Sequence, residues 1–221
     1  MGLKLRHHLS VINDAASRRV IKQFATKYHL VYFGRVDSRE DEHQLIRGIT
    51  VSTSHADNHY TVGTVQGHDI MLVQRRNTIS FPGKPDAEYK WLIMEIETTQ
   101  NKLPHLFIDG HRHDETFYAN MFVKVPAFQD ITGDIAQRDA NFARHYHVFG
   151  LPNQYARVNA VLTPEMTGAI TQHFHQFDFE IVEDRVYVYA AGHVVTLATL
   201  QEMLRVGVWL ADTLNAANLP D

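Results

Sequence analysis

The histidines are the side chains of this sequence most able to do chemistry, because their rings bind transition metals and exchange protons near neutral pH. The chain has 15 histidines in 221 residues, about twice the ordinary usage. The densest group of metal-competent side chains is 109–115, with two imidazoles and three carboxylates. Imidazole together with carboxylate suits zinc, manganese, iron or nickel. The candidate ligands for a divalent transition metal in this segment are Asp109, His111, His113 and Asp114.

A second pair of candidate ligands is His145 and His147, in a segment predicted to be a strand over 142–149. Residues two apart on a strand point the same way, so this pair could join the first group around one ion. A bound metal ion lowers the pKa of water and supplies hydroxide near neutral pH. One hypothesis for function is therefore a metal-dependent hydrolase that uses the turn 109–115.

The sequence lacks the motifs that would make this chemistry specific. It contains no His-Glu-x-x-His, no phosphate-binding Gly-Lys-Ser/Thr loop and no Gly-x-Ser-x-Gly elbow. The absence of cysteine excludes disulfides, thiolate metal sites and cysteine nucleophiles. A polar turn at the end of a hairpin is the simpler explanation of 109–115, and solvent-facing histidines are the simpler explanation of His145 and His147. The favoured hypothesis is therefore a binding or structural protein without catalytic activity or cofactor.

Composition narrows the partners that the chain can have. The net charge of −4 gives no basic excess to neutralise phosphates, which argues against a nucleic-acid-binding protein. No segment reaches the roughly 20 apolar residues that span a bilayer. The sequence therefore predicts a soluble, cytoplasmic protein with no membrane span.

The elements that must position the candidate site are mostly strands in the first half of the chain. Residues 10–29 have apolar side chains at helical spacing, and alternating or apolar runs follow. Gly67 separates two of these runs and predicts a hairpin. In 91–97 we expect Leu92, Met94 and Ile96 to face the core. The predicted strands are 30–36, 45–53, 59–66, 68–74, 91–97, 103–108 and 116–125, with an irregular connection over 126–139.

The second half of the chain has clear helix starts. Thr163-Pro164-Glu165 predicts a helix over 164–175, and Thr196 caps a long last helix with an apolar stripe. Between them, 177–182 and 185–191 predict a hairpin. Because strands mostly follow strands, we expect an α+β fold with antiparallel sheet, an N-terminal helix, the 164–175 helix and the long C-terminal helix.

Two further expectations concern the whole chain. We expect residues 1–221 to form a single domain, with 126–141 as the place where a subdivision would fall. The apolar stripe of the last helix could also pack against a second copy, which predicts a homo-oligomer. Val206, Val208 and Trp209 extend this stripe.

A set of short segments spread along the chain carries a resemblance to known sequences. These segments are Tyr32-Phe33-Gly34, Arg47-Gly48-Ile49-Thr50, Leu103-Pro104-His105, Phe142, Tyr146, Val148, Phe149, Ala160, Leu162-Thr163-Pro164-Glu165, 177–181 and 186–189. They resemble uncharacterised bacterial proteins, including hypothetical proteins of reduced-genome bacteria. The resemblance covers about half of the chain, and its motifs are structural. It implies an α+β fold and carries no assigned activity, so it supplies no catalytic residue.

Overall fold

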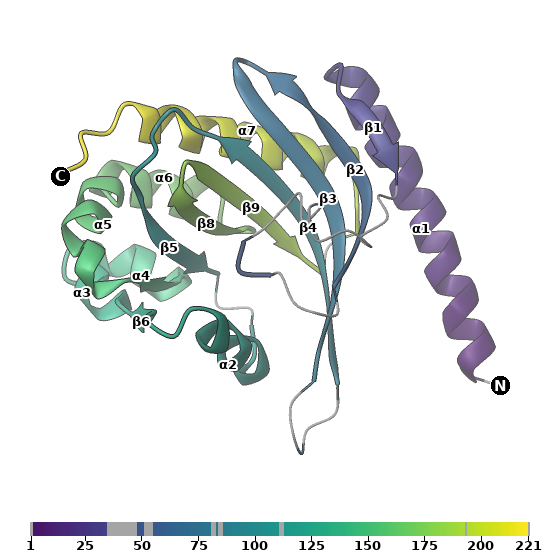
Figure 1. Cartoon of the computed structure of the whole chain (residues 1–221), viewed down its shortest axis with the longest axis horizontal. Helices are drawn as coiled ribbons and strands as arrows, with labels where there is room; N and C mark the ends of the chain where they lie inside the picture. Colours follow the sequence, from purple (N-terminus) through teal and green to yellow (C-terminus); the bar gives the residue numbers. More distant parts are fainter. Residues whose placement is uncertain are drawn as a thin grey trace.

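The computed structural model describes residues 2–34, 48–50, 55–80, 83, 86–110, 113–192 and 194–220. The strands in these ranges form one antiparallel sheet in the order β1-β2-β3-β4-β9-β8-β5-β7-β6 (Figure 1). The strands are β1 (Val31–Gly34), β2 (Ala56–Val65), β3 (His68–Ile79), β4 (Ala87–Glu97), β5 (Leu103–Asp109), β6 (Gln129–Asp130), β7 (His147–Gly150), β8 (Asp178–Glu183) and β9 (Arg185–Ala191).

Helices flank this sheet on both sides, and the predicted α+β class is confirmed. The N-terminal helix, the helix near 164–175 and the long C-terminal helix are all present, as α1, α6 and α7. Within the described ranges, no helix is both long and apolar enough to cross a membrane. The helices are α1 (Gly2–Lys27), α2 (Glu115–Lys124), α3 (Thr132–Ala136), α4 (Ala140–His145), α5 (Tyr155–Val161), α6 (Pro164–His173) and α7 (Leu197–Asn215), with a 3₁₀ turn at Pro152–Gln154.

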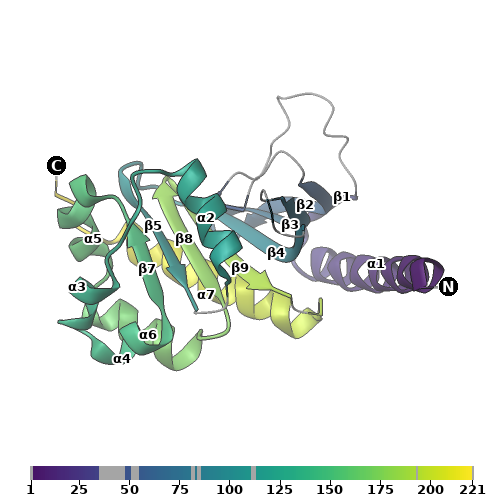
Figure 2. The same cartoon turned by 90° about the horizontal axis from the view of Figure 1, so that it is seen from below.

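The two faces of the sheet carry different helices. One face packs against α1 and α7, and the opposite face packs against α2 (Figure 2). Leu92, Met94 and Ile96 face α1 and α7, as expected from the alternation of β4. Trp91 and Ile93 point to the other face and are buried there as well. β4 is therefore covered on both faces, which the alternation alone did not predict.

The α7 helix lies unusually close to the sheet at Gly207. A Cβ atom at this position would clash with Ile96 Cδ1 and lie 3.1 Å from Ile96 Cγ1. The helix begins where predicted, because the Thr196 side chain accepts a hydrogen bond from Thr199 N at 3.0 Å. Its apolar stripe, including Val206 and Val208, is buried within the same chain.

The predicted strand 116–125 is wrong, because this segment forms α2. The Asp114 side chain caps the helix by accepting a hydrogen bond from Phe117 N at 2.9 Å. Phe117 and Met121, four residues apart, then bury one helical face against the sheet. The segment 109–115 is consequently a strand-to-helix connection and not the tip of a hairpin.

The predicted strand 142–149 is also wrong, because it divides into the end of α4 and the strand β7. Asp139 caps α4 by accepting hydrogen bonds from Asn141 N and Phe142 N at 3.1 and 2.9 Å. Tyr146 ends the helix in an extended conformation. The connection predicted as irregular over 126–139 contains β6 and α3.

Other strand predictions have mixed outcomes. The hairpin about Gly67 is confirmed, since β2 pairs with β3 up to Val65 and His68. The hairpin 177–191 is confirmed as β8 and β9. Of the predicted strand 45–53, residues 48–50 form a turn, and the remainder lies outside the described residues.

Candidate functional site

The sheet face that carries α2 is rich in buried polar side chains. β5 supplies His105 and Asp109, and the neighbouring strand β8 supplies Asp178 and Glu180. His113 stands just before α2 and Lys124 ends it. These side chains gather into two groups, one at each end of α2. We call the first, Asp109, His113 and Asp178, the Asp–His–Asp group. The second, His105, Lys124 and Glu180, lines a cavity that we call the Glu180 cavity.

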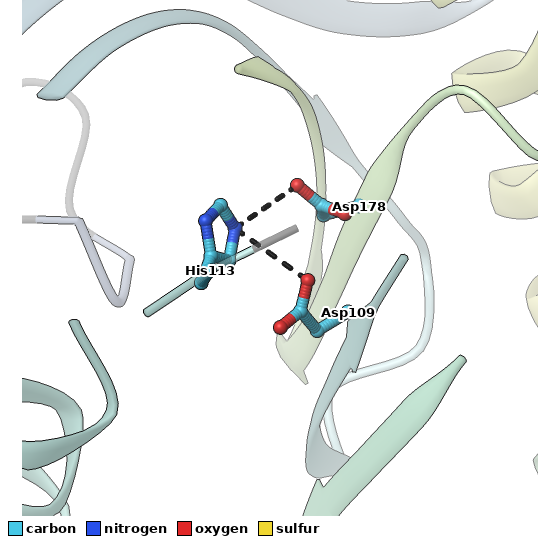
Figure 3. Close-up of side chains that lie close together, drawn as sticks. All are labelled: Asp109, His113 and Asp178. Carbon is cyan, nitrogen blue, oxygen red and sulfur yellow. Dashed lines mark hydrogen bonds and ion pairs between the residues drawn. The ribbon is translucent and has the colours of Figure 1, made fainter. Parts of the chain in front are cut away.

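The Asp–His–Asp group brings three metal-competent side chains together in the core (Figure 3). His113 Nε2 lies 3.2 Å from Asp178 Oδ2 and 3.6 Å from Asp109 Oδ1. The exposed fractions of the three side chains are 3% for His113, 1% for Asp178 and 0% for Asp109. The imidazole is thus held between two buried carboxylates.

Each carboxylate of the group is also oriented by a hydrogen-bond donor. The Tyr118 hydroxyl donates to Asp109 Oδ2, and Gly110 N donates to Asp178 Oδ1 at 2.8 Å. One oxygen of each carboxylate is therefore anchored while the other faces His113. The imidazole is packed among aromatic rings, with ring-centroid distances of 4.2 Å to Phe117 and 4.9 Å to Trp91.

The electrostatics of the group act on His113 in opposite directions. Burial by itself lowers the pKa of this imidazole, because the charged form loses its hydration. The hydrogen bond to Asp178 and the charges of Asp178, Asp109 and Asp114 outweigh burial, so that the pKa of His113 is raised overall. In the absence of a metal, the group therefore favours a protonated imidazole between the carboxylates.

The structure places the remaining predicted ligands elsewhere. Asp114 caps α2, and its Oδ1 also accepts a hydrogen bond from the Tyr89 hydroxyl at 2.6 Å, which lowers the pKa of the Asp114 carboxyl. His145 is exposed on α4, where its Nδ1 contacts Asn141 O at 2.9 Å. His147 begins β7, so the two histidines do not share a strand face. His111 lies outside the described residues.

Sequence reasoning missed Asp178 as a member of the group. It lies 65 residues after His113 along the chain. The available signal was its place in the hairpin: Asp178 and Glu180 alternate with the apolar residues Phe179 and Ile181, which puts both acids on one face. Only the pairing of β8 with β5 brings Asp178 close to His113 and Glu180 close to His105.

The Glu180 cavity has a volume of about 650 Å³, within the range of pockets that hold small molecules. Glu180 lines it, and both of its carboxylate oxygens make hydrogen-bond contacts. Its Oε1 contacts His105 Nε2 at 2.8 Å, and its Oε2 accepts from Ile49 N at 2.7 Å and from the Tyr189 hydroxyl at 2.5 Å. The other lining residues include the cations Lys124 and Arg185, the carboxylates Glu183 and Asp184, and Val182 and Tyr187.

Gly48 allows the turn 48–50 to approach Glu180 this closely. Its φ of +79° lies in the left-handed region that favours glycine. A Cβ atom here would clash with the Tyr189 hydroxyl and lie 2.9 Å from Glu180 Oε2. The wall of the cavity formed by Ile49 therefore depends on glycine at position 48.

Lys124 is the cation of the cavity whose pKa is lowered by its surroundings. Burial, followed by the charge of Arg75, lowers the pKa of its ammonium group to about 8. Its Nζ donates a hydrogen bond to Ile49 O at 2.9 Å. Among the residues that the structure describes, Lys124 forms no ion pair with a carboxylate, although the charge of Glu180 acts to raise its pKa. Arg185, in contrast, is paired with Glu95 and Asp184.

Comparison with known proteins yields a likeness of fold. No protein-family model matches the chain, and no curated protein matches it. A solved structure described as the mycobacterial trehalose monomycolate transport factor A, TtfA, aligns with a TM-score of 0.62. The alignment covers 93% of this chain and 98% of the other at 11% sequence identity. This likeness supports the α+β fold, and the resemblance to uncharacterised bacterial proteins remains a prediction.

Proposed function

We propose that the chain is a binding protein whose Glu180 cavity takes a small anionic molecule, with a carboxylate or phosphate group facing Lys124. The observation that carries the proposal is a cavity of about 650 Å³ lined by an ammonium group that has no described ion-pair partner. An anion placed beside Lys124 would offset the unfavourable burial of this charge.

The other polar groups of the cavity favour binding over catalysis. Both oxygens of Glu180 already accept hydrogen bonds, so this carboxylate is held as a fixed wall. Arg185 is engaged by Glu95 and Asp184. Lys124 would then contact a ligand through its charge and Tyr187 through its aromatic surface, while the lining carboxylate of Glu183 would turn away from an anion.

The alternative of a metal-dependent hydrolase receives less support. The Asp–His–Asp group offers suitable ligand atoms, but its side chains are at most 3% exposed. A hydrolytic metal needs an open position that water and substrate can reach. We therefore do not place a reaction at this group.

The name of TtfA describes a factor for trehalose monomycolate transport, and we do not propose trehalose monomycolate as a ligand of this chain. At 11% identity, the likeness concerns the fold. The chemistry of Lys124 in this chain is the basis for the anionic ligand.

Thermal-shift measurements at pH 7 and low salt would test the proposal. The probes are sugar phosphates and di- and tricarboxylates, each measured beside a neutral counterpart such as glucose for glucose 6-phosphate. We expect at least one anion to raise the Tm by roughly 5–10 °C at a hundredfold excess over its Kd, and its neutral counterpart to have little effect.

Two matched variants make this test specific. Lys124→Met should abolish the preference for the anion, because it keeps the length of the side chain and removes its charge. Lys90→Met is the control, since Lys90 is exposed on β4 and paired with Glu88 at 3.5 Å. A panel in which no anion stabilises the protein, or in which Lys124→Met responds as the wild type does, would refute the proposal.

A further inference from the structure

The geometry of the Asp–His–Asp group matches what a tetrahedral metal site needs. Ligand atoms bound about 2.0–2.2 Å from zinc lie roughly 3.3–3.6 Å from one another at tetrahedral angles. His113 Nε2 lies 3.2 Å from Asp178 Oδ2 and 3.6 Å from Asp109 Oδ1. All three ligand atoms lie within 4.8 Å of one another. The two pairs that include His113 therefore already have about the separation of tetrahedral zinc ligands.

The surroundings hold the three side chains in this arrangement. The Tyr118 hydroxyl and Gly110 N each anchor the outer oxygen of one carboxylate. The inner oxygens of Asp109 and Asp178 are directed at His113 (Figure 3). Metal-binding carboxylates are commonly fixed by such outer hydrogen bonds, which contribute to metal affinity. Phe117 and Trp91 pack beside the His113 ring and limit its movement.

The charge of the group also favours a divalent cation. Asp109 and Asp178 bring two carboxylates into a group whose side chains are at most 3% exposed. A buried charge of this kind is unfavourable unless it is paired. A divalent ion with two carboxylates and a neutral imidazole has a net charge of zero.

We propose that Asp109, His113 and Asp178 supply three ligands to one divalent transition-metal ion, preferably Zn²⁺, in a buried site where a water molecule takes the fourth position. On binding, His113 Nε2 releases its proton to solvent and forms a bond to the metal, and each aspartate supplies one oxygen. The site joins β5, β8 and the residue that precedes the cap of α2. The metal would therefore fasten α2 to the sheet, a role separate from ligand binding in the Glu180 cavity.

Metal titration of the full chain, purified without a histidine tag and dialysed against a chelator, tests this proposal. Calorimetry with ZnCl₂ and with MnCl₂ should show one equivalent of zinc bound per chain, more tightly than manganese. Zinc should raise the Tm by roughly 5–10 °C at a hundredfold excess over its Kd. Less than about a tenth of an equivalent of either metal, with no change in Tm, would overturn the proposal, because a ligand of the native state must stabilise it.

Variants then identify the ligands. Asp178→Asn removes a charged ligand but keeps an oxygen for Gly110 N, and should weaken zinc binding by about a hundredfold or more, since loss of an outer-shell partner alone costs 10–100-fold. Tyr118→Phe removes only the outer hydrogen bond and should weaken binding by about 10–100-fold. If Asp178→Asn does not fold, Tyr118→Phe is the variant that tests whether zinc binds at this group.

His145→Gln is the control variant, because His145 is exposed on α4 and lies outside the group. It should bind zinc as the wild type does. Binding that survives unchanged in the folded Asp178→Asn or Tyr118→Phe protein would overturn the assignment, and so would binding that is lost in His145→Gln.

Discussion

Burial changes the acid–base behaviour of Lys124 in the proposed ligand cavity. Its ammonium group is partly buried beside Arg75, and its pKa is lowered to about 8. The unfolded chain has no such environment, so Lys124 there titrates near the ordinary value of about 10.4. The difference between the two states makes Lys124 a source of pH-dependent stability.

The sign of this pH dependence follows from which state holds the proton. Between pH 8 and about 10.4 the unfolded chain keeps the Lys124 proton while the folded chain releases it, so the free energy of unfolding rises with pH through this residue. Below pH 8 the folded state carries the full penalty of the buried charge. Lys124→Met should therefore stabilise the protein at pH 7 and remove this rise.

Urea unfolding of the wild type and Lys124→Met between pH 6 and 10 would measure the effect. The difference in stability between the two proteins should shrink as the pH rises above 8. Lys90→Met is again the control, since Lys90 is exposed. A difference that stays constant with pH would contradict a lowered pKa at Lys124.

At the scale of elements, α2 and α7 cover opposite faces of the sheet in different ways. Asp114 caps α2. His113, just before this cap, belongs to the Asp–His–Asp group, and Lys124, the last residue of α2, lines the Glu180 cavity. The other face is covered by α7, whose apolar stripe packs closely at Gly207. The position of α2 thus brings side chains to the two polar groups, whereas that of α7 buries apolar side chains in the core.

The close approach of α7 predicts opposite effects for the same substitution in two helices. Gly207→Ala should lower stability, because overpacking against Ile96 costs about 1–3 kcal/mol and exceeds the gain in helix propensity of up to about 1 kcal/mol. Gly168→Ala in α6 should raise stability by up to about 1 kcal/mol, since nothing lies within 4 Å of a Cβ atom there. Thermal unfolding of both variants is the measurement, and stabilisation by Gly207→Ala would show that α7 can move away from β4.

At the scale of the whole molecule, the sheet interleaves distant parts of the chain. β9 and β8 lie between β4 and β5, although β4 and β5 are consecutive in sequence. The seam between β4 and β9 runs from Trp91 opposite Ala191 to Glu97 opposite Arg185. This continuity supports the expectation of a single domain over 1–221, including the region 126–141, and that expectation remains a prediction.

A single domain should unfold in one transition, and the two tryptophans can report on it. Trp91 lies in the core beside α2, and Trp209 on α7 packs against Phe174 at a ring-centroid distance of 5.4 Å. In Trp209→Phe and in Trp91→Phe, the fluorescence of the remaining tryptophan should follow the far-UV circular dichroism of the same variant during urea unfolding. Separate midpoints within either variant would indicate two independently unfolding parts.

Self-association through the C-terminal helix also belongs to this scale. Val206 and Val208 are buried in the chain's own core, and Trp209 is partly buried. A second copy would therefore have to use the remaining surface of α7. The homo-oligomer stays a prediction, which light scattering of the full chain would test.

The sequence by itself determined the elements whose signals are local. Thr163-Pro164-Glu165 and Thr196 started the predicted helices, because caps and proline act within one turn. Alternating residues on either side of Glu183-Asp184 predicted the hairpin of β8 and β9. The strand predicted over 116–125 was wrong, because its apolar residues suit a helix as well as a strand. In the structure Phe117 and Met121 are buried on one face of the helix α2.

Tertiary structure alone decided which residues form the site. The sequence indicated Asp109 and His113 as neighbours, but Asp178 joins them only through the pairing of β5 with β8. The same pairing places His105 beside Glu180, 75 residues away. Spacing along the chain predicts side chains that share one element, whereas contacts between elements depend on the order of strands in the sheet and on the burial that fixes it.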